Sequence, residues 1–113
     1  MHEMALAEGV LQIVEDAARR EGLRRVRTVR LEIGQLASVE PEAIRFCFDA
    51  VTRESVAAGA RLEIIATAGA AWCEECLAPV ALAAFGDACP RCGGYRLRVT
   101  GGTEMRVTEV EAE

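Results

Sequence analysis

The stretch Cys73-Glu74-Glu75-Cys76, followed after twelve intervening residues by Cys89-Pro90-Arg91-Cys92-Gly93, decides what kind of fold this chain can have. Each Cys-x-x-Cys pair lets two thiolates of one tight turn reach the same ion, and Gly93 permits the second turn to close with amides facing the sulfurs. Two such turns, joined by a short hairpin, supply four sulfurs in tetrahedral geometry, which suits Zn²⁺. The spacing therefore predicts a zinc site made of Cys73, Cys76, Cys89 and Cys92.

The role of this zinc follows from its full set of protein ligands. With no position left for water or substrate, the site is expected to be structural rather than catalytic. Residues 70–99 change in composition to Gly, Ala, Cys and Pro, and so short a segment cannot bury a core of its own. Zinc binding contributes on the order of 10–16 kcal/mol in small finger peptides and would make up that deficit.

Three other readings of the cysteines remain open, and zinc is preferred over each. A rubredoxin-like iron site uses similar turns but normally has more aromatic shielding than Trp72, Phe85 and Tyr95 provide. A thioredoxin-like redox site needs a single pair in a βαβ setting. Two disulfides would suit a secreted protein.

Composition limits the classes of function. The chain has 113 residues, enough for one core and a metal-held appendage. Thirteen arginines and no lysine oppose eighteen acidic residues, for a net charge of −5, which argues against nonspecific nucleic-acid binding. Six of the arginines lie between Arg19 and Arg30. We interpret them as a solvated helix end and a charged strand face in preference to a phosphate-binding patch.

The amino-terminal residues predict the compartment. Met1-His2-Glu3-Met4 lacks the positive start of a signal peptide, and no apolar run approaches the roughly twenty residues that a membrane helix needs. We therefore expect a cytoplasmic protein that does not enter a membrane. In a reducing compartment, paired cysteines are more often metal ligands than disulfides.

Hydrophobic periodicity predicts an α+β fold, with two helices on a small three-stranded, mainly antiparallel sheet and an inserted tetracysteine zinc-ribbon domain. The first helix carries an apolar stripe of Leu6, Val10, Ile13, Val14 and Ala17. The first strand buries Val29, Leu31 and Ile33 and exposes Thr28, Arg30 and Glu32. The last strand suits a sheet edge. The expected elements are helices Met4–Glu21 and Val39–Ser55 and strands Val26–Ile33, Arg61–Ala68 and Thr103–Glu111.

The expected domain division follows from this order. Residues 1–69 and 100–113 form one domain, because the chain needs a closing strand after the cysteine segment, and residues 70–99 are inserted in it. The fifth cysteine, Cys47, shares an apolar helix face with Ile44, Phe48 and Val51. It is therefore expected to be a buried packing residue rather than a reactive thiol.

The only histidine of the chain is His2. A lone histidine is most often a surface residue with no special role, but this position offers the terminal amine, the His2 amide nitrogen and the imidazole in one short chelating stretch. Such nitrogen donors suit Ni²⁺ or Cu²⁺ in a square plane. Met1 should be retained, because His2 is a bulky second residue.

Taken together, these stretches resemble the HypA/HybF family of hydrogenase nickel-incorporation proteins. The resemblance covers essentially the whole chain, and the Met-His-Glu start joined to this zinc module is its most specific part. The stretches that carry it are MHEMALAEGVLQIVE, RVRTVRLEIGQL, VEPEAIRFCFDAVT, GARLEI, CEEC, CPRCG and GGTEMRVTEVE.

The resemblance implies a nickel-binding α/β domain with a zinc ribbon inserted in it. It implies nickel carried by His2, the amino-terminal backbone with the Met1 amine, and Glu3; Glu40 matches a loop acid suggested to assist in some relatives. Some members use a further histidine from the zinc region, and this sequence has none there. Family members deliver nickel to the hydrogenase large subunit with a partner GTPase, and in some organisms to urease.

Two other classes of function compete with this nickel metallochaperone. One is a zinc-ribbon interaction module without specific nickel binding, in which His2 is incidental. Its nucleic-acid version is weakened because Arg91, Arg96 and Arg98 are matched by Glu74, Glu75 and Asp87. The other is a small enzyme, which is disfavoured because His2 is the only histidine that could pair with a nucleophile.

Overall fold

The computed structural model describes residues 2–113 of the chain. The chain divides into two compact units. The first comprises residues up to 31 together with 39–65 and 106–113, and the second comprises 32–38 and 66–105. No helix within residues 2–113 combines the length and apolarity needed to cross a bilayer.

Helix α1, His2–Glu21, begins the first unit. It forms because Ala7, Val10, Val14 and Ala18 recur at helical spacing and bury one face, and it is followed by Gly22 at φ 66°, a left-handed stop. The predicted start at Met4 is therefore two residues late. The predicted stripe was also rotated, since Ile13 is 51% exposed.

Helix α2, Pro41–Val51, is shorter at both ends than predicted. Glu40 caps it, accepting a hydrogen bond from the Glu42 amide at 3.2 Å, and proline suits its first turn. At the other end, the Thr52 hydroxyl donates to the Phe48 carbonyl at 2.8 Å and the chain continues in turns. Ile44, Cys47 and Phe48 are buried as expected, so Cys47 is a core residue.

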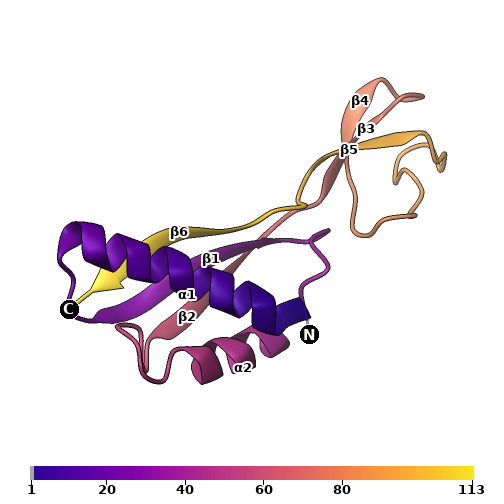
Figure 1. Ribbon diagram of the computed structural model, residues 1–113. Coiled ribbons are helices and arrows are strands. Elements are labelled where there is room, and N and C mark those ends of the chain that lie inside the picture. The colour runs from indigo at the N-terminus through magenta and orange to yellow at the C-terminus, as the bar shows by residue number, and fades with distance from the viewer. Residues whose placement is uncertain (1) are drawn as a thin grey trace. The chain divides into compact units, whose positions relative to one another are not determined.

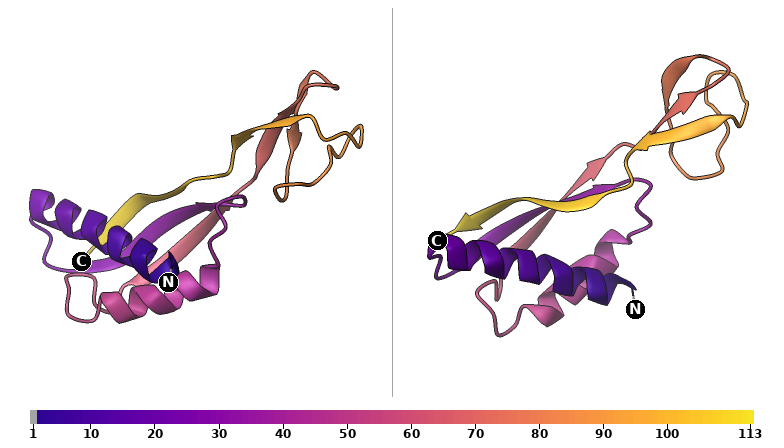
Figure 2. Two further views of the ribbon diagram at one scale, coloured as in Figure 1. Left: turned by 45° about the vertical axis from the view of Figure 1, so that its right-hand side comes forward. Right: turned by 45° about the horizontal axis from the view of Figure 1, so that its top comes forward.

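The two helices lie on one face of a three-stranded sheet (Figures 1 and 2). Its strands are β1, Val26–Gly34, β2, Arg61–Thr67, and β6, Met105–Ala112, in the order β2-β1-β6. Strand β6 runs antiparallel to β1, and β2, which follows the α2 crossover, runs in the direction of β1 (Figure 1). The predicted edge position of the last strand and the α+β fold are confirmed.

One side-chain assignment in β1 was wrong. Thr28 was expected on the solvent face with Arg30 but is only 6% exposed. The buried side chains are Val26 and Thr28 at the start of the strand and then Val29, Leu31 and Ile33. The alternation of buried and exposed positions therefore shifts by one residue after Thr28. Simple alternation cannot predict such a change of phase.

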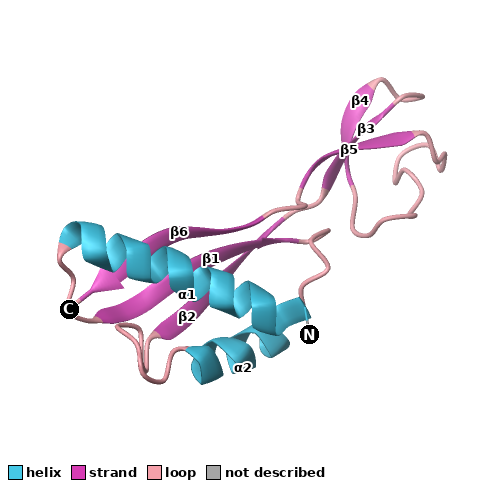
Figure 3. Cartoon of the chain, in the orientation of Figure 1, coloured by secondary structure: helices cyan, strands magenta, loops and turns pink. Residues whose placement is uncertain are grey.

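The second unit contains strands that the sequence analysis did not resolve (Figure 3). They are β3, Ala70–Cys73, β4, Ala78–Ala81, and β5, Leu97–Gly101, in the order β4-β3-β5. Both β4 and β5 pair antiparallel with β3. The small core of this unit includes Leu36, Ala71, Val80 and Leu82 beside Cys73 and Cys89, so the metal-ligand candidates are part of its core.

Gly34 and Gly102 allow two backbone segments of the second unit to approach each other closely. A Cβ on Gly34 would lie 2.1 Å from the Gly102 carbonyl oxygen, and Gly102 itself has φ 83°. The Leu36 amide donates to that same carbonyl at 2.7 Å. Residues 32–38 are thereby held against the chain that leaves β5.

Candidate metal centres

The four predicted zinc ligands meet at one point of the second unit. The sulfurs of Cys73, Cys76, Cys89 and Cys92 all lie within 4.8 Å of one another. Two of the separations are 3.7 Å, between Cys73 and Cys92, and 3.9 Å, between Cys76 and Cys89. Four sulfurs placed about 2.3 Å from a tetrahedral Zn²⁺ would be about 3.8 Å apart, so the cluster fits zinc.

The same distances exclude the disulfide alternative. A disulfide joins its sulfurs at about 2.05 Å, and all five cysteines are free. Cys47 lies apart from the cluster, buried in the first unit.

Backbone amides point at three of the cluster sulfurs. The amides of Cys76, Arg91 and Gly94 lie 3.4 Å from the sulfurs of Cys73, Cys89 and Cys92 respectively. These donors stabilise thiolate charge and fix the direction of each ligand. The sequence indicated amides facing sulfur near Gly93, but it did not identify which residues donate.

The two cysteine turns are built alike. The Leu77 amide donates to the Cys73 carbonyl, and the Gly93 amide donates to the Cys89 carbonyl, each at 2.8 Å. Leu77 and Gly93 both have positive φ, 53° and 75°. Glycine adopts this conformation freely, whereas leucine adopts it at a cost, so the first turn is the more strained.

The thiols of the cluster differ in acidity. Burial raises the pKa of Cys76 to about 12, whereas a hydrogen bond from the Cys92 backbone lowers the pKa of Cys89 to about 7. A divalent cation binds thiolates, so loading the site releases protons. With all four positions filled by sulfur, the arrangement can hold a metal but leaves no open position for substrate.

The second candidate site is the start of α1 in the first unit. The side chain of His2 is 59% exposed, and its Nδ1 lies 3.6 Å from Oε2 of Glu3. That same Glu3 oxygen accepts from the Glu40 amide at 3.5 Å. Hydrogen bonds, first from its own amide and then from that of Glu40, lower the pKa of Glu3. The carboxylate is therefore held ionised beside the imidazole.

Glu40 reaches this site through its backbone only. Its side-chain oxygen accepts from the Glu42 amide as the cap of α2. The structure thus brings together His2, Glu3 and the Glu40 backbone, while the Glu40 carboxylate has another role. The Met1 amine, also expected to bind nickel, lies outside the described residues.

Comparison with known proteins places this geometry in a family. The family model described as "Hydrogenase/urease nickel incorporation, metallochaperone, hypA" matches residues 1–112. Curated relatives named "Hydrogenase maturation factor HypA" include one from Albidiferax ferrireducens, 65% identical, and one from Dechloromonas aromatica, 62% identical. Both alignments span 113 residues and the full length of both chains.

Solved structures agree on the fold. The solution structure of the nickel metallochaperone HypA from Helicobacter pylori has a TM-score of 0.70 at 21% identity, covering 97% of this chain and 96% of that one. A second structure, "Solution structure of HypA protein", has a TM-score of 0.73 at 23% identity, covering 100% and 97%. The family match over residues 1–112, the full-length relatives and the cysteine cluster agree, and this chain belongs to the HypA family of hydrogenase maturation metallochaperones.

Proposed function

We propose that this chain binds Ni²⁺ at its amino terminus and delivers it to the large subunit of a [NiFe]-hydrogenase, acting as a carrier and not as an enzyme. The nickel ligands proposed are His2, the Met1 amine and the adjacent backbone, and Glu3. Zn²⁺ held by the four cysteines has a structural role. The domain division proposed remains residues 1–69 with 100–113, and an inserted ribbon at 70–99.

The observation that carries this proposal is the position of the only histidine at the exposed start of α1. The first four amides of a helix have no acceptor within the helix, so the His2 amide is available to a metal. The positive end of the helix dipole also lowers the cost of removing its proton. Imidazole and backbone nitrogen can then join the amine in a square plane suited to Ni²⁺.

Glu3 supports the site in a second way. Its side chain is only 16% exposed, and it is held by the Glu40 amide at the start of α2. A carboxylate fixed beside His2 offers either a ligand or a hydrogen-bond partner to the imidazole. Glu40 is kept as an assisting residue, acting through its backbone.

The proposed partners follow from the family. They are a maturation GTPase and the hydrogenase large subunit, with urease maturation proteins as further recipients, and all are expected in the cytoplasm. A carrier must hold nickel yet release it on docking. An exposed terminus allows the acceptor's ligands to reach the ion without unfolding the carrier.

The test is a calorimetric nickel titration of untagged, zinc-loaded protein. His2→Ala should abolish nickel binding and leave zinc content unchanged, because no zinc ligand is touched. Glu8→Ala is the matched control, since Glu8 is exposed on the same helix. Wild-type nickel affinity in His2→Ala would refute the site, and absence of specific binding in the wild type would favour the zinc-ribbon interaction module.

A further inference from the structure

A pocket of about 400 Å³ lies in the first unit and takes no part in either metal site. It is bordered by the start of β1, the turn before β2 and the end of β6. Its lining carries three arginines, two glutamates and Thr28, and the charged members are Arg25, Arg27, Arg61, Glu111 and Glu113.

The sequence alone favoured a solvated role for Arg25 and Arg27, in preference to phosphate binding. The structure adds two facts that the sequence could not show. Arg61, far along the chain on β2, lines the same pocket. Thr28, also on the wall, is only 6% exposed.

The arginines that line the pocket form few ion pairs, and those they form are weak. Arg25 lies 3.8 Å from Glu113 and Arg61 lies 3.5 Å from Glu63, and because both arginines are well exposed these ion pairs have little strength. Within the described chain, Arg27 forms no ion pair. Several guanidinium donors therefore remain available in one concave place.

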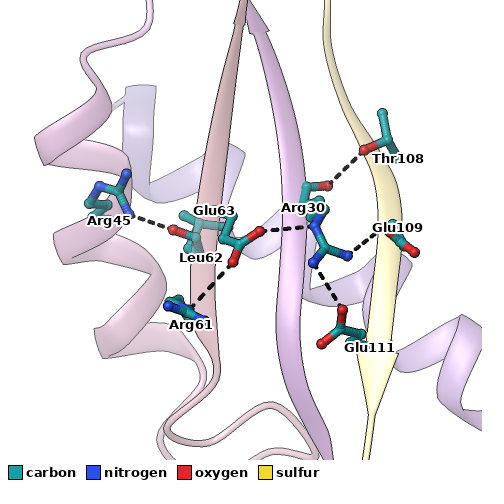
Figure 4. A network of polar contacts seen from close by, with 8 residues as sticks. All are labelled: Arg30, Arg45, Arg61, Leu62, Glu63, Thr108, Glu109 and Glu111. Carbon is teal, nitrogen blue, oxygen red and sulfur yellow. Dashed lines mark hydrogen bonds and ion pairs between the residues drawn. The ribbon is translucent and has the colours of Figure 1, made fainter.

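The lining of the pocket contains fewer carboxylates than arginines. Glu111 accepts from Arg30 at 2.9 Å, within a network in which Arg30 also contacts Glu63 and Glu109 (Figure 4). Among the residues that line the pocket, three arginines against two glutamates leave one net positive charge. In a chain of net charge −5, this is a local site for an anion.

We propose that this pocket binds a phosphate group, held by Arg27, Arg61 and Arg25 with the Thr28 hydroxyl as an additional donor. Guanidinium groups match phosphate oxygens with paired hydrogen bonds. A phosphate carries a charge near −2 and three strongly accepting oxygens, which uses more of these donors than a single carboxylate can. The proposal is independent of nickel binding.

The test is a titration of the zinc-loaded, nickel-free full chain with inorganic phosphate at constant ionic strength, in which amide NMR shifts report binding. The amides of Thr28 and Gly59 should shift and saturate. Arg27→Gln and Arg61→Gln should each weaken phosphate binding about ten- to a hundredfold. Thr28→Val, which keeps the side-chain shape, should weaken it several-fold. Arg53→Gln, at an exposed arginine outside the pocket, is the matched control.

A competition experiment with ADP distinguishes a site for a nucleotide phosphate from a site for the free phosphate ion. If ADP competes with phosphate at the same amides, the site accepts a nucleotide phosphate; if phosphate binds and ADP does not, it is a site for the free ion. Both results support the proposal. Non-saturating shifts, an equal response in Arg27→Gln and wild type, or acetate binding as tight as phosphate would each overturn it.

Discussion

The tetracysteine cluster and the amino-terminal site differ in burial and in how many ligands the fold supplies. Cys73 and Cys89 are in the core of the second unit, and backbone amides orient the sulfurs. His2 is exposed at the end of a helix, with one neighbouring carboxylate. A closed set of four thiolates suits a resident metal, whereas an open and partly backbone-built site suits a metal that must leave. The contrast predicts that each site can be removed without the other.

The largest effect is expected from the cluster. Cys73→Ser removes a buried ligand, and the second unit then loses metal-binding free energy on the order of 10 kcal/mol. Zinc content should fall and the amide signals of residues 70–99 should collapse to unfolded positions, while nickel binding by the first unit persists. Cys47→Ala is the control, because Cys47 is buried away from the cluster. Full zinc content in Cys73→Ser would contradict the assignment.

Blocking the terminal amine should have the next largest effect. Acetylation, or an uncleaved amino-terminal extension, leaves His2 and Glu3 intact but removes one nitrogen donor. Nickel affinity should fall by at least about a hundredfold, because loss of a ligand exceeds the 10- to 100-fold cost of losing a ligand's hydrogen-bond partner. A carboxy-terminal extension without histidine serves as the control. Equal affinity in free and blocked forms would leave a side-chain site only.

Glu3→Gln tests the carboxylate alone, and calorimetry should show nickel affinity about tenfold lower with unchanged zinc. Because the pKa of Glu3 is lowered from 4.5, the ratio of wild-type to variant affinity should be constant across neutral pH. The stability that the Glu3 contacts give the first unit is present above its ordinary pKa and is lost only as pH falls through the lower folded value. A ratio that changes near neutrality would assign the effect to another group.

The smallest effect concerns the two cysteine turns. Leu77→Gly should relieve the left-handed strain and stabilise the zinc-loaded second unit by about 1 kcal/mol, seen as slower zinc loss to a chelator. Gly93→Ala should act in the opposite direction by a similar amount. Nickel binding should not respond to either change. Faster zinc loss from Leu77→Gly would mean that the Leu77 side chain contributes more than its backbone costs.

The cysteine cluster was predictable because the spacing of ligands within a turn restricts where their sulfurs can lie. The α2 core face was predictable from Ile44, Cys47 and Phe48 for a similar local reason. Elements that depend on distant partners were not. Strands β3 and β4 contain only four residues each, too few for a periodic signal, and the burial of Thr28 depends on segments far away in the chain.

The amino-terminal site was predictable in part. His2 could be singled out, but the helix was expected to start at Met4, so the free amides of the first turn were not placed at His2. The hydrogen bond from the Glu40 amide to Glu3 joins residues 37 positions apart. The family resemblance pointed to the Glu40 carboxylate instead, whereas that side chain caps α2.

X-ray absorption at the nickel and zinc edges of one doubly loaded, untagged wild-type sample tests the central claim most directly. Zinc should show four sulfurs at about 2.3 Å. Nickel should show only nitrogen and oxygen ligands, including an imidazole, in planar geometry. Sulfur in the nickel shell, or an imidazole in the zinc shell, would contradict the account of a resident metal held by cysteines and a cargo metal held at the amino terminus.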